Sequence, residues 1–363
     1  MKFNIGISGA TGVTGEVALR ILEERGFPVG ALRLFASRRS AGQTIHWKGA
    51  DHRIEALEDG NFAGLDLVIS ATSASIAREW APRMVKAGAI VIDQSSAFRL
   101  DPSVPLVVPE INANDLKFHN GTLAGPNCTT AVAIMAIAPL HQAFGVEYVV
   151  SSSYQAISGK GREGIKEFLD SSAKAVSQSE ALRGREPLNL PAPLQFPHHS
   201  AFNLFPQCEE FREGDDTSTE EEKMQSEMRK ILHAPELTVH ATAIRVPVLV
   251  GHTVSLAVSL KEPVSVAEAR RVIESFPGVR VLDAPWTGKY PTPLAAAGID
   301  DILAGRIRSI PFLKNGLSMV ASGDNLRKGN ALNAIQVAER VLGLERFVNG
   351  LKRITHPHCH CPV

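Results

Sequence analysis

A cysteine lies directly before a long apolar stretch of the chain, in the run Gly125-Pro-Asn-Cys128-Thr-Thr130. We predict that the apolar stretch is a buried helix, which puts Cys128 at the helix N-terminus. The exposed backbone N–H groups and the positive end of the helix dipole would then lower the pKa of the thiol and favour the nucleophilic thiolate. The same N–H groups could stabilise an oxyanion. A buried structural cysteine is the alternative, and the residue type alone does not decide between the two.

A histidine and an arginine stand close together in the second half of the sequence. His252 begins a predicted strand, and imidazole is the usual proton carrier beside a catalytic cysteine, although a structural histidine is the alternative. Arg245 interrupts an apolar strand. Alternation puts its side chain on the opposite side from Ile244, Val246 and Val248. A charge in such a strand needs an anionic partner, which is either a structural carboxylate or a substrate.

Three further charged residues are candidates for binding ions. A capped helix is predicted to begin at Ser218, since Ser218 and Glu221 have the spacing of a capping box. Glu220 and Lys223 lie one turn apart on this helix, where a solvent-exposed ion pair is the default interpretation. Arg99 follows the C-terminal end of a predicted parallel strand, which is where ligands bind in open α/β sheets. We therefore predict that Arg99 contacts an anion.

Three glycines separate the first predicted strand from the first predicted helix, in the run Gly9–Gly15 with G-x-x-G-x-x-G spacing. Glycines at this junction allow a tight turn and the close approach of a pyrophosphate to the helix N-terminus. We predict dinucleotide binding, with a structural turn as the alternative.

The second strand is followed by Ser37–Gly42, which contains Arg38 and Arg39 but no acid for the ribose 2′-hydroxyl of NAD. Guanidinium groups suit a 2′-phosphate, so NADP is predicted, with a solvated basic turn as the alternative.

The first half of the chain alternates short apolar runs with amphipathic stretches. Strands are predicted at Phe3–Ser8, Ala31–Ala36, Leu65–Ser70 and Ala89–Asp93, shorter strands at Leu106–Pro109 and Gly121–Ala124, and helices at Glu16–Arg25 and Ile76–Ala87. Such alternation predicts right-handed βαβ units around a parallel sheet. The first domain should therefore be of the α/β class.

The pattern changes in the second half. Longer strands are predicted at Glu147–Gln155, His240–Val250 and His252–Leu260, and the last of these alternates apolar with small polar residues. This alternation is typical of an antiparallel sheet with one buried face, so the second domain should be α+β. Ser171–Ser218 has little periodicity and is predicted to be a lid or an interface arm. Gly329–Arg346 is predicted to be an amphipathic helix.

Composition limits the class of protein further. The chain has 363 residues and a mass of 39.0 kDa, enough for two domains. Lys plus Arg and Asp plus Glu both total 38, and this balance argues against a general nucleic-acid or membrane binder. Four cysteines do not make a disulfide framework, and with no apolar leader they predict a soluble cytoplasmic protein. The tail His356–Cys361 is rich in metal-ligand types, but its spacing is too tight for a tetrahedral zinc site, so no metal is predicted.

Taken together, these segments resemble the aspartate-β-semialdehyde dehydrogenase family over nearly the whole chain. The resemblance rests on ten motifs in order: Gly9–Gly15, Ser37–Gly42, Asp93–Asp101, Val107–Glu110, Pro126–Thr130, Tyr154–Gly159, Ala201–Pro206, Arg245–His252, Tyr290–Pro293 and Asp324–Gly329. Each motif alone is a weak signal, and their shared order makes the resemblance specific. It implies a Rossmann-like NADP-binding domain at 1–127 with 329–354 and a central mixed-sheet catalytic and dimerisation domain at 128–328. The tail at 355–363 is predicted to be disordered because chain ends usually are.

The resemblance also implies roles for individual residues. Cys128 would be the nucleophile and His252 the acid and base, while Gln155 orients the reacting group. The remaining implied substrate contacts are Arg245 with the α-carboxylate, Glu220 with the α-amino group, and Arg99, Asn127 and Lys223 with phosphate. The implied cofactor contacts are Gly9, Thr11, Gly12, Val13, Gly15, Ser37, Arg38, Ser158, Gly159 and Asn325.

The implied activity is the NADPH-dependent reduction of L-aspartyl-4-phosphate to L-aspartate 4-semialdehyde, with release of phosphate, through a thioacyl intermediate on Cys128. The family acts in the biosynthesis of lysine by way of diaminopimelate, of threonine and of methionine, and a homodimer is expected. Two positions depart from the family pattern. Thr253-Val254-Ser255 replaces the common Ser-x-Ser, and Lys160 stands where a small residue is usual. Neither departure touches a proposed catalytic atom.

Two other functions fit part of the pattern. N-acetyl-γ-glutamyl-phosphate reductase shares the glycine loop and the cysteine chemistry, but its substrate has no free α-amine for Glu220 to bind. A non-catalytic protein with this fold would be expected to lose the cysteine or the histidine. This chain keeps both Cys128 and His252.

Overall fold

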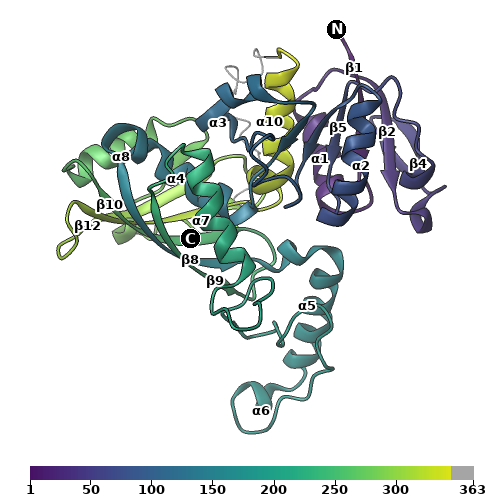
Figure 1. The fold of residues 1–363 in the computed structure, drawn as a ribbon. Coiled ribbons are helices and arrows are strands. Elements are labelled where there is room, and N and C mark those ends of the chain that lie inside the picture. The colour runs from purple at the N-terminus through teal and green to yellow at the C-terminus, as the bar shows by residue number, and fades with distance from the viewer. Residues whose placement is uncertain (345–363) are drawn as a thin grey trace.

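Two β-sheets, each with its own hydrophobic core, make up the computed structural model, which describes residues 1–344 (Figure 1). The predicted end of the last helix at Arg346, the segment 345–354 and the tail 355–363 lie outside the described residues. Within the described part of the chain, no helix combines the length and the apolar composition needed to cross a membrane.

The N-terminal sheet has seven strands in the order β3-β4-β2-β1-β5-β6-β7. The strands are β1 (Phe3–Ser8), β2 (Val29–Ala36), β3 (Thr44–Trp47), β4 (Ala50–Ala56), β5 (Leu67–Ser70), β6 (Ile90–Asp93) and β7 (Thr122–Ala124). All neighbouring pairs are parallel except β3 and β4, which confirms the predicted parallel sheet. The β3–β4 hairpin was missed because most of its side chains are exposed or only partly buried and form no apolar run.

Helices cover both faces of this sheet. α1 (Val13–Glu24) and α10 (Leu332–Val341) pack together on one face, and α2 (Ala74–Lys86) packs on the other. The last helix of the described chain therefore returns to the first domain, and it lies beside α1 in Figure 1. One predicted strand is wrong, since Leu106 makes only an isolated bridge to Ala124 and Pro109 starts the short helix α3 (Pro109–Asn112).

The second sheet has six strands in the order β11-β12-β13-β10-β8-β9. The strands are β8 (Val146–Gln155), β9 (Thr238–Arg245), β10 (His252–Leu260), β11 (Val279–Val281), β12 (Ile302–Ile310) and β13 (Gly316–Gly323). The β8–β9 and β11–β12 pairs are parallel and the others are antiparallel, so the sheet is mixed. The predicted strand His240–Val250 is too long: β9 ends at Arg245, and Pro247 lies just beyond, where a ladder N–H would be lost.

One face of the second sheet is covered and the other is open. The core on the covered face is formed with α4 (Cys128–Phe144), α7 (Thr219–Ile231) and α8 (Val266–Glu274), and the short helix α9 (Pro293–Ala296) lies near β13. The alternation predicted for β10 is present, with Val254, Leu256 and Val258 buried. The division at residues 127/128 and 328/329 stays a prediction, since the core of the second sheet also includes Val104, Leu106, Val108 and Ala124 from before residue 128.

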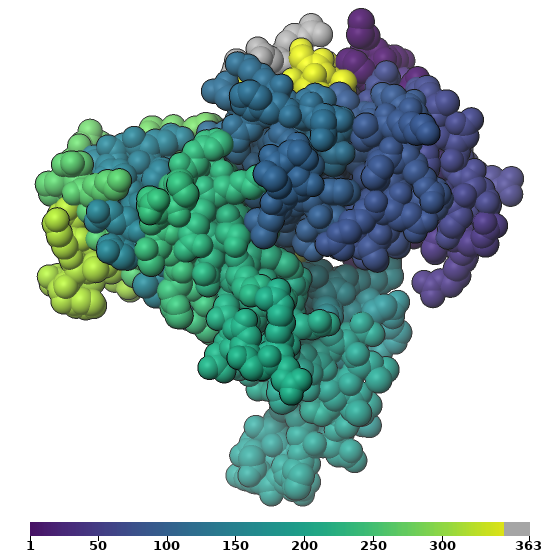
Figure 2. Space-filling view, in the orientation of Figure 1, coloured from purple at the N-terminus to yellow at the C-terminus, as the bar shows by residue number. Residues whose placement is uncertain are grey.

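An arm projects from the second domain below the rest of the molecule (Figures 1 and 2). It contains α5 (Gly161–Val176) and α6 (Ser179–Leu182), followed by an irregular segment. The predicted arm at Ser171–Ser218 is thus helical at its start. The segment returns to the body through isolated antiparallel bridges of Phe205 with Arg245 and of Phe211 with Ser218.

A buried ion pair connects the domains where the chain leaves β13 for α10. Lys328 lies in a π-helical turn, Arg327–Ala331, and its Nζ donates to Glu110 Oε2 at 2.6 Å, to Asn333 Oδ1 at 3.0 Å and to Gln336 Oε1 at 2.8 Å. Burial lowers the pKa of Lys328, and Glu110 opposes that shift. The pair therefore holds the position of the π-helical turn.

Lys328→Met removes one partner of this pair and leaves the Glu110 carboxylate buried without its cation. We expect a loss of about 3 kcal/mol of stability, because an uncompensated buried charge is costly. A drop in the thermal unfolding midpoint checks this. The control Lys166→Met breaks the exposed pair with Asp170 and should cost less than about 1 kcal/mol. Equal midpoints for the two variants would contradict the prediction.

Candidate active site

Cys128 begins α4, as the sequence predicts, and α4 is almost entirely buried. Asn127 is the N-cap residue, and its Oδ1 accepts the backbone N–H groups of Thr129 at 2.8 Å and Thr130 at 3.1 Å. The chain reaches this point directly from β7 of the first sheet. The thiol therefore lies where the two domains meet.

His252 lies beside the thiol and can carry a proton. Its Nε2 lies 3.2 Å from Cys128 Sγ, and its Nδ1 accepts the backbone N–H of Ala156 at 3.0 Å. Burial, and then the positive charge of Arg245, lower the pKa of His252 to about 3. The ring is therefore neutral at neutral pH, and because Nδ1 is an acceptor, the ring proton sits on Nε2 and points at the sulfur.

The predicted lowering of the Cys128 pKa is wrong for this structure. Burial, and then the negative charge of Glu220, raise the pKa of Cys128 to about 12, although Arg99 and Arg245 oppose the shift. The backbone N–H groups of Thr129 and Thr130, which were expected to face the thiolate or an oxyanion, donate to the Asn127 side chain instead. Without substrate, Cys128 is therefore a thiol and His252 beside it is a neutral imidazole.

Glu220 connects α4 to the second sheet. The carboxylate is 3% exposed and accepts Asn127 Nδ2 at 3.0 Å, Thr129 Oγ1 at 3.3 Å and Gln155 Nε2 at 2.9 Å. It lies in the first turn of α7, where the predicted capping box of Ser218 and Glu221 is confirmed. Gln155, the last residue of β8, is thereby brought to the site with its amide already oriented.

Arg245 is a buried cation with no carboxylate partner among residues 1–344. Its Nη1 donates to the carbonyl of Ala156 at 2.6 Å, its guanidinium lies 5.9 Å from the centre of the Phe196 ring, and its Nε has no partner in the described chain. The side chain is on the same buried side of β9 as Ala241 and Ala243. The sequence left two anionic partners open for Arg245, a structural carboxylate and a substrate. The described chain supplies no such carboxylate.

Arg99 is buried and held from three directions. Its Nη1 pairs with Glu227 Oε1 at 3.1 Å, its Nε donates to the carbonyl of Gly125 at 2.9 Å, and its Nη2 donates to that of Gln94 at 2.8 Å. Glu227 also accepts the backbone N–H of Asn127 at 2.6 Å, and burial raises the pKa of Glu227, which Arg99 opposes. Arg99 and Asn127 are thus brought together as predicted.

Sequence reasoning missed Glu227 and Glu209 as site residues. Glu227 lies two helical turns after Glu220 on α7, so the spacing along one helix face could have found it. Lys223 forms its main ion pair with Glu209 and lies 3.9 Å from Glu220 Oε2, so the predicted Glu220–Lys223 pair is secondary. Glu209 belongs to the irregular segment, where no periodicity marks it.

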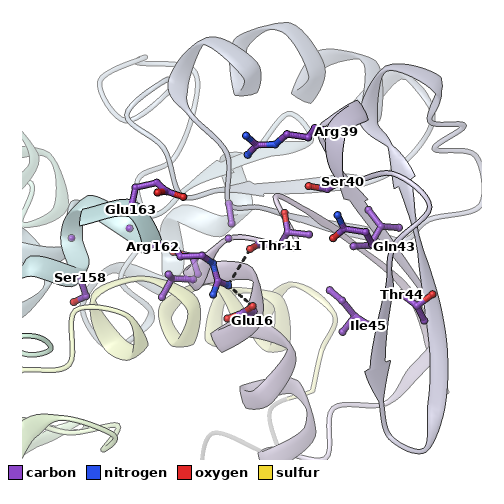
Figure 3. A pocket seen from close by; sticks show the side chains of 17 residues that line it. Thr11, Glu16, Arg39, Ser40, Gln43, Thr44, Ile45, Ser158, Arg162 and Glu163 are labelled. Atoms are coloured by element: carbon purple, nitrogen blue, oxygen red, sulfur yellow. Dashed lines mark hydrogen bonds and ion pairs between the residues drawn. The ribbon is translucent and has the colours of Figure 1, made fainter. Parts of the chain in front are cut away.

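A cleft of about 760 Å³ lies between the glycine loop and the start of α5 (Figure 3). Its lining includes five predicted cofactor residues, which are Thr11, Gly12, Val13, Ser158 and Gly159. Gly9 has φ +82°, and a Cβ there would lie 2.3 Å from the carbonyl oxygen of Ala71, while a Cβ at Gly15 would lie 2.5 Å from that of Gly9. Only glycine permits this packing of the loop, so the residues fit a dinucleotide.

Other predicted cofactor residues lie behind or outside this lining. Arg38 pairs with Asp59 at 2.8 Å on the surface, and neither Arg38 nor Ser37 lines the cleft, whereas Arg39 does. Asn325 supports the lining: its Nδ2 donates to Ser158 Oγ at 2.9 Å, and its Oδ1 accepts the N–H of Gly251 at 2.9 Å. No group of three or more His, Cys, Asp or Glu within 1–344 is placed to hold a metal ion.

Comparison with known proteins identifies the class. The family model for the semialdehyde dehydrogenase NAD-binding domain matches residues 4–119, and that for the semialdehyde dehydrogenase dimerisation domain matches residues 137–328. Fold and site together are therefore those of a two-domain semialdehyde dehydrogenase, an oxidoreductase with a nucleotide-binding domain and a mixed-sheet dimerisation domain.

Individual relatives narrow this class. The aspartate-semialdehyde dehydrogenase of Aquifex aeolicus is 42% identical over 342 residues, which cover 93% of this chain and 98% of the relative. That of Bacillus subtilis is 38% identical over 338 residues, 93% of this chain and 96% of the relative. The structure of aspartate semialdehyde dehydrogenase II of Vibrio cholerae superposes with a TM-score of 0.87 at 34% identity, covering 94% of this chain and 99% of that one. The chain belongs to the aspartate-semialdehyde dehydrogenase family.

Glu220→Gln tests the effect of this carboxylate on the thiol. Removing the charge should lower the pKa of Cys128 by about one unit. Alkylation by iodoacetamide should then be about threefold faster below that pKa, since a less basic thiolate is also a weaker nucleophile. Rates measured between neutral and about pH 10 check this. Glu222→Gln, on the same helix but paired with Arg212 at the surface, is the control and should follow the unmodified protein. Slower alkylation of Glu220→Gln would contradict the prediction.

Proposed function

We propose that this chain reduces L-aspartyl-4-phosphate to L-aspartate 4-semialdehyde and phosphate with NADPH, through a thioacyl intermediate on Cys128, in the biosynthesis of lysine, threonine and methionine. The observation that carries the proposal is the placement of Cys128 Sγ 3.2 Å from His252 Nε2, beside the guanidinium of Arg245, which has no carboxylate partner among residues 1–344. The relatives named above are aspartate-semialdehyde dehydrogenases over almost the whole chain.

The proposed substrate carries the charges that the site needs. Its α-carboxylate would pair with Arg245, its α-ammonium with Glu220, and its phosphate with Arg99, Asn127 and Lys223. Carboxylate binding offsets the charge of Arg245 and so raises the pKa of His252. Ammonium binding offsets the charge of Glu220 and so lowers the pKa of Cys128. The lower pKa of Cys128 favours the thiolate, so the substrate itself would activate the nucleophile.

In the first step, Cys128 Sγ bonds to the acyl carbon and the carbon–oxygen bond to phosphate breaks. The leaving phosphate takes up the proton that the thiol loses, and a thioester remains on Cys128. His252 Nε2–H lies beside the sulfur, where it can donate to the oxygen of the tetrahedral species. Gln155, oriented by Glu220, would hold the acyl group.

When bound, reduced nicotinamide supplies a hydride to the thioester. His252 can then donate to the resulting oxyanion on the carbon that remains bonded to Sγ. Collapse of this species breaks the carbon–sulfur bond, releases the aldehyde and returns Cys128 as thiolate beside His252 Nε2–H. Thioester formation and its reduction would thus use one histidine donor.

The cleft supports NADP as the cofactor. The glycine loop would hold the diphosphate at the N-terminus of α1. Arg39, with Ser40 beside it in the lining, would meet the 2′-phosphate. Arg38 is the residue that the sequence singled out for this contact, but its guanidinium is engaged by Asp59. We therefore assign the 2′-phosphate contact to Arg39.

We propose a homodimer that uses the open face of the second sheet, and a cytoplasmic location. The match to a dimerisation domain supports the dimer. On β8, Tyr148, Val150 and Tyr154 leave 53%, 52% and 37% of their surface exposed, so the uncovered face of the sheet carries an apolar strip. Both cysteines of the described chain, Cys128 and Cys208, are free thiols, which suits a reducing compartment.

The activity is tested in reverse, by phosphate-dependent reduction of NADP with L-aspartate semialdehyde. Activity should be absent or far lower with N-acetyl-L-glutamate semialdehyde, whose blocked amine cannot neutralise Glu220. Cys128→Ser should reduce turnover by several orders of magnitude, because a serine hydroxyl is almost wholly protonated at neutral pH. Mass spectrometry of the unmodified enzyme mixed with L-aspartyl-4-phosphate should show the acyl adduct on Cys128. Near-normal turnover of Cys128→Ser would rule out the covalent route.

Arg39→Ala tests the choice between the cofactors. We expect the KM for NADP to rise about tenfold or more, since a charge-assisted contact to the 2′-phosphate is lost. The KM for NAD should change by less than about twofold. Arg38→Ala removes the same charge one residue earlier and is the matched control, with little effect on either KM. The reverse result, in which only Arg38→Ala weakens NADP, would return the contact to Arg38.

A further inference from the structure

An ion pair spans the cleft at the glycine loop. Arg162, the second residue of α5, places Nη2 2.5 Å from Glu16 Oε1 and donates to the carbonyl oxygen of Thr11 at 3.3 Å. Figure 3 shows the guanidinium reaching from the α5 side of the cleft to both residues. Both charged side chains are about half exposed, at 56% for Arg162 and 49% for Glu16. An exposed pair of this kind contributes little to stability, so its position rather than its strength calls for an explanation.

The lining of the cleft contains two cations, Arg39 and Arg162. Arg39 comes from the turn between β2 and β3 of the first domain, where a 2′-phosphate would lie. Arg162 comes from the second domain and contacts the glycine loop, where the N-terminus of α1 offers backbone N–H groups to a diphosphate. The two guanidinium groups therefore match two different anionic parts of one dinucleotide.

We infer that Arg162 is a diphosphate-binding residue, which exchanges Glu16 for the cofactor diphosphate when the dinucleotide binds. This inference rests on the proposed NADP binding and adds a contact from the second domain to it. Glu16 holds the guanidinium beside the loop but also places a negative charge where the diphosphate arrives. Glu16 and the diphosphate thus compete for one cation, and the two should have opposite effects on affinity.

The same turn supplies a matched control. Lys160 is two residues from Arg162 and carries the same charge, but it is exposed and does not line the cleft. General attraction of an anionic cofactor by positive charge would involve both residues. A direct contact with the diphosphate would involve Arg162 alone.

The experiment measures dissociation constants by calorimetry on the full-length chain, at one ionic strength. The ligands are NADP, NAD and adenosine 2′-monophosphate, which lacks a diphosphate. We expect Arg162→Ala to weaken NADP and NAD by about tenfold each and to leave adenosine 2′-monophosphate unchanged. Lys160→Ala should stay within about twofold of the unmodified protein for all three ligands. Arg39→Ala should give the complementary pattern and weaken the two ligands that carry a 2′-phosphate.

Glu16→Gln separates a binding role from a purely structural one. If Glu16 competes with the diphosphate, the variant binds NADP and NAD about threefold more tightly, and in Glu16→Gln/Arg162→Ala this gain is reduced. If the pair only holds the domains together, Glu16→Gln and Arg162→Ala both weaken binding, which would overturn the inference. Unchanged affinity of Arg162→Ala for NADP and NAD would also overturn it. Failure of the unmodified protein to bind either dinucleotide would instead overturn the proposed cofactor, and this role with it.

Discussion

The hydrogen bonds of Asn127 are the contacts on which the geometry of the site depends. Its side chain caps α4 through the backbone N–H groups of Thr129 and Thr130, and its Nδ2 donates to Glu220. Its own backbone N–H donates to Glu227. Two carboxylates of α7 therefore hold Asn127, one through its side chain and one through its backbone. Because Cys128 follows directly, the thiol has little freedom to move. The distances from His252 and Arg245 to the sulfur are therefore well defined.

The same network sets the electrostatic state of the site. Burial disfavours the thiolate of Cys128 and the imidazolium of His252, and Glu220 and Arg245 add to these two effects, so the two groups at rest are held in their neutral forms. A buried charge without its counterion is costly, and the protein keeps Arg245 in that state. Under the proposed function, this cost would be recovered when a substrate with a carboxylate and an ammonium group binds. Substrate binding and activation of the thiol would then have the same electrostatic cause.

Sequence patterns predicted those parts of the fold that depend on interactions between residues close together in the chain. The glycine loop, the start of α4 at Cys128, the capping box at Ser218 and the alternation in β10 all depend on neighbours within one or two turns of chain. Features that depend on tertiary contacts could not be predicted in this way. Arg38 pairs with Asp59 from outside the turn and does not line the cleft, whereas Arg39 does. The raised pKa of the thiol likewise depends on burial and on a carboxylate from another helix.

The return of α10 to the first domain has a mechanical consequence. The chain crosses between the domains twice in the described residues, once from β7 to Cys128 and once from β13 through the π-helical turn. The crossings lie side by side, since a Cβ on Gly329 would be 3.1 Å from Cys128 Cβ. If one domain rotates against the other, these two adjacent covalent connections define the axis of the rotation. Rotation of one domain against the other would open and close the cleft at its outer edge while the sulfur, close to the axis, stays almost still.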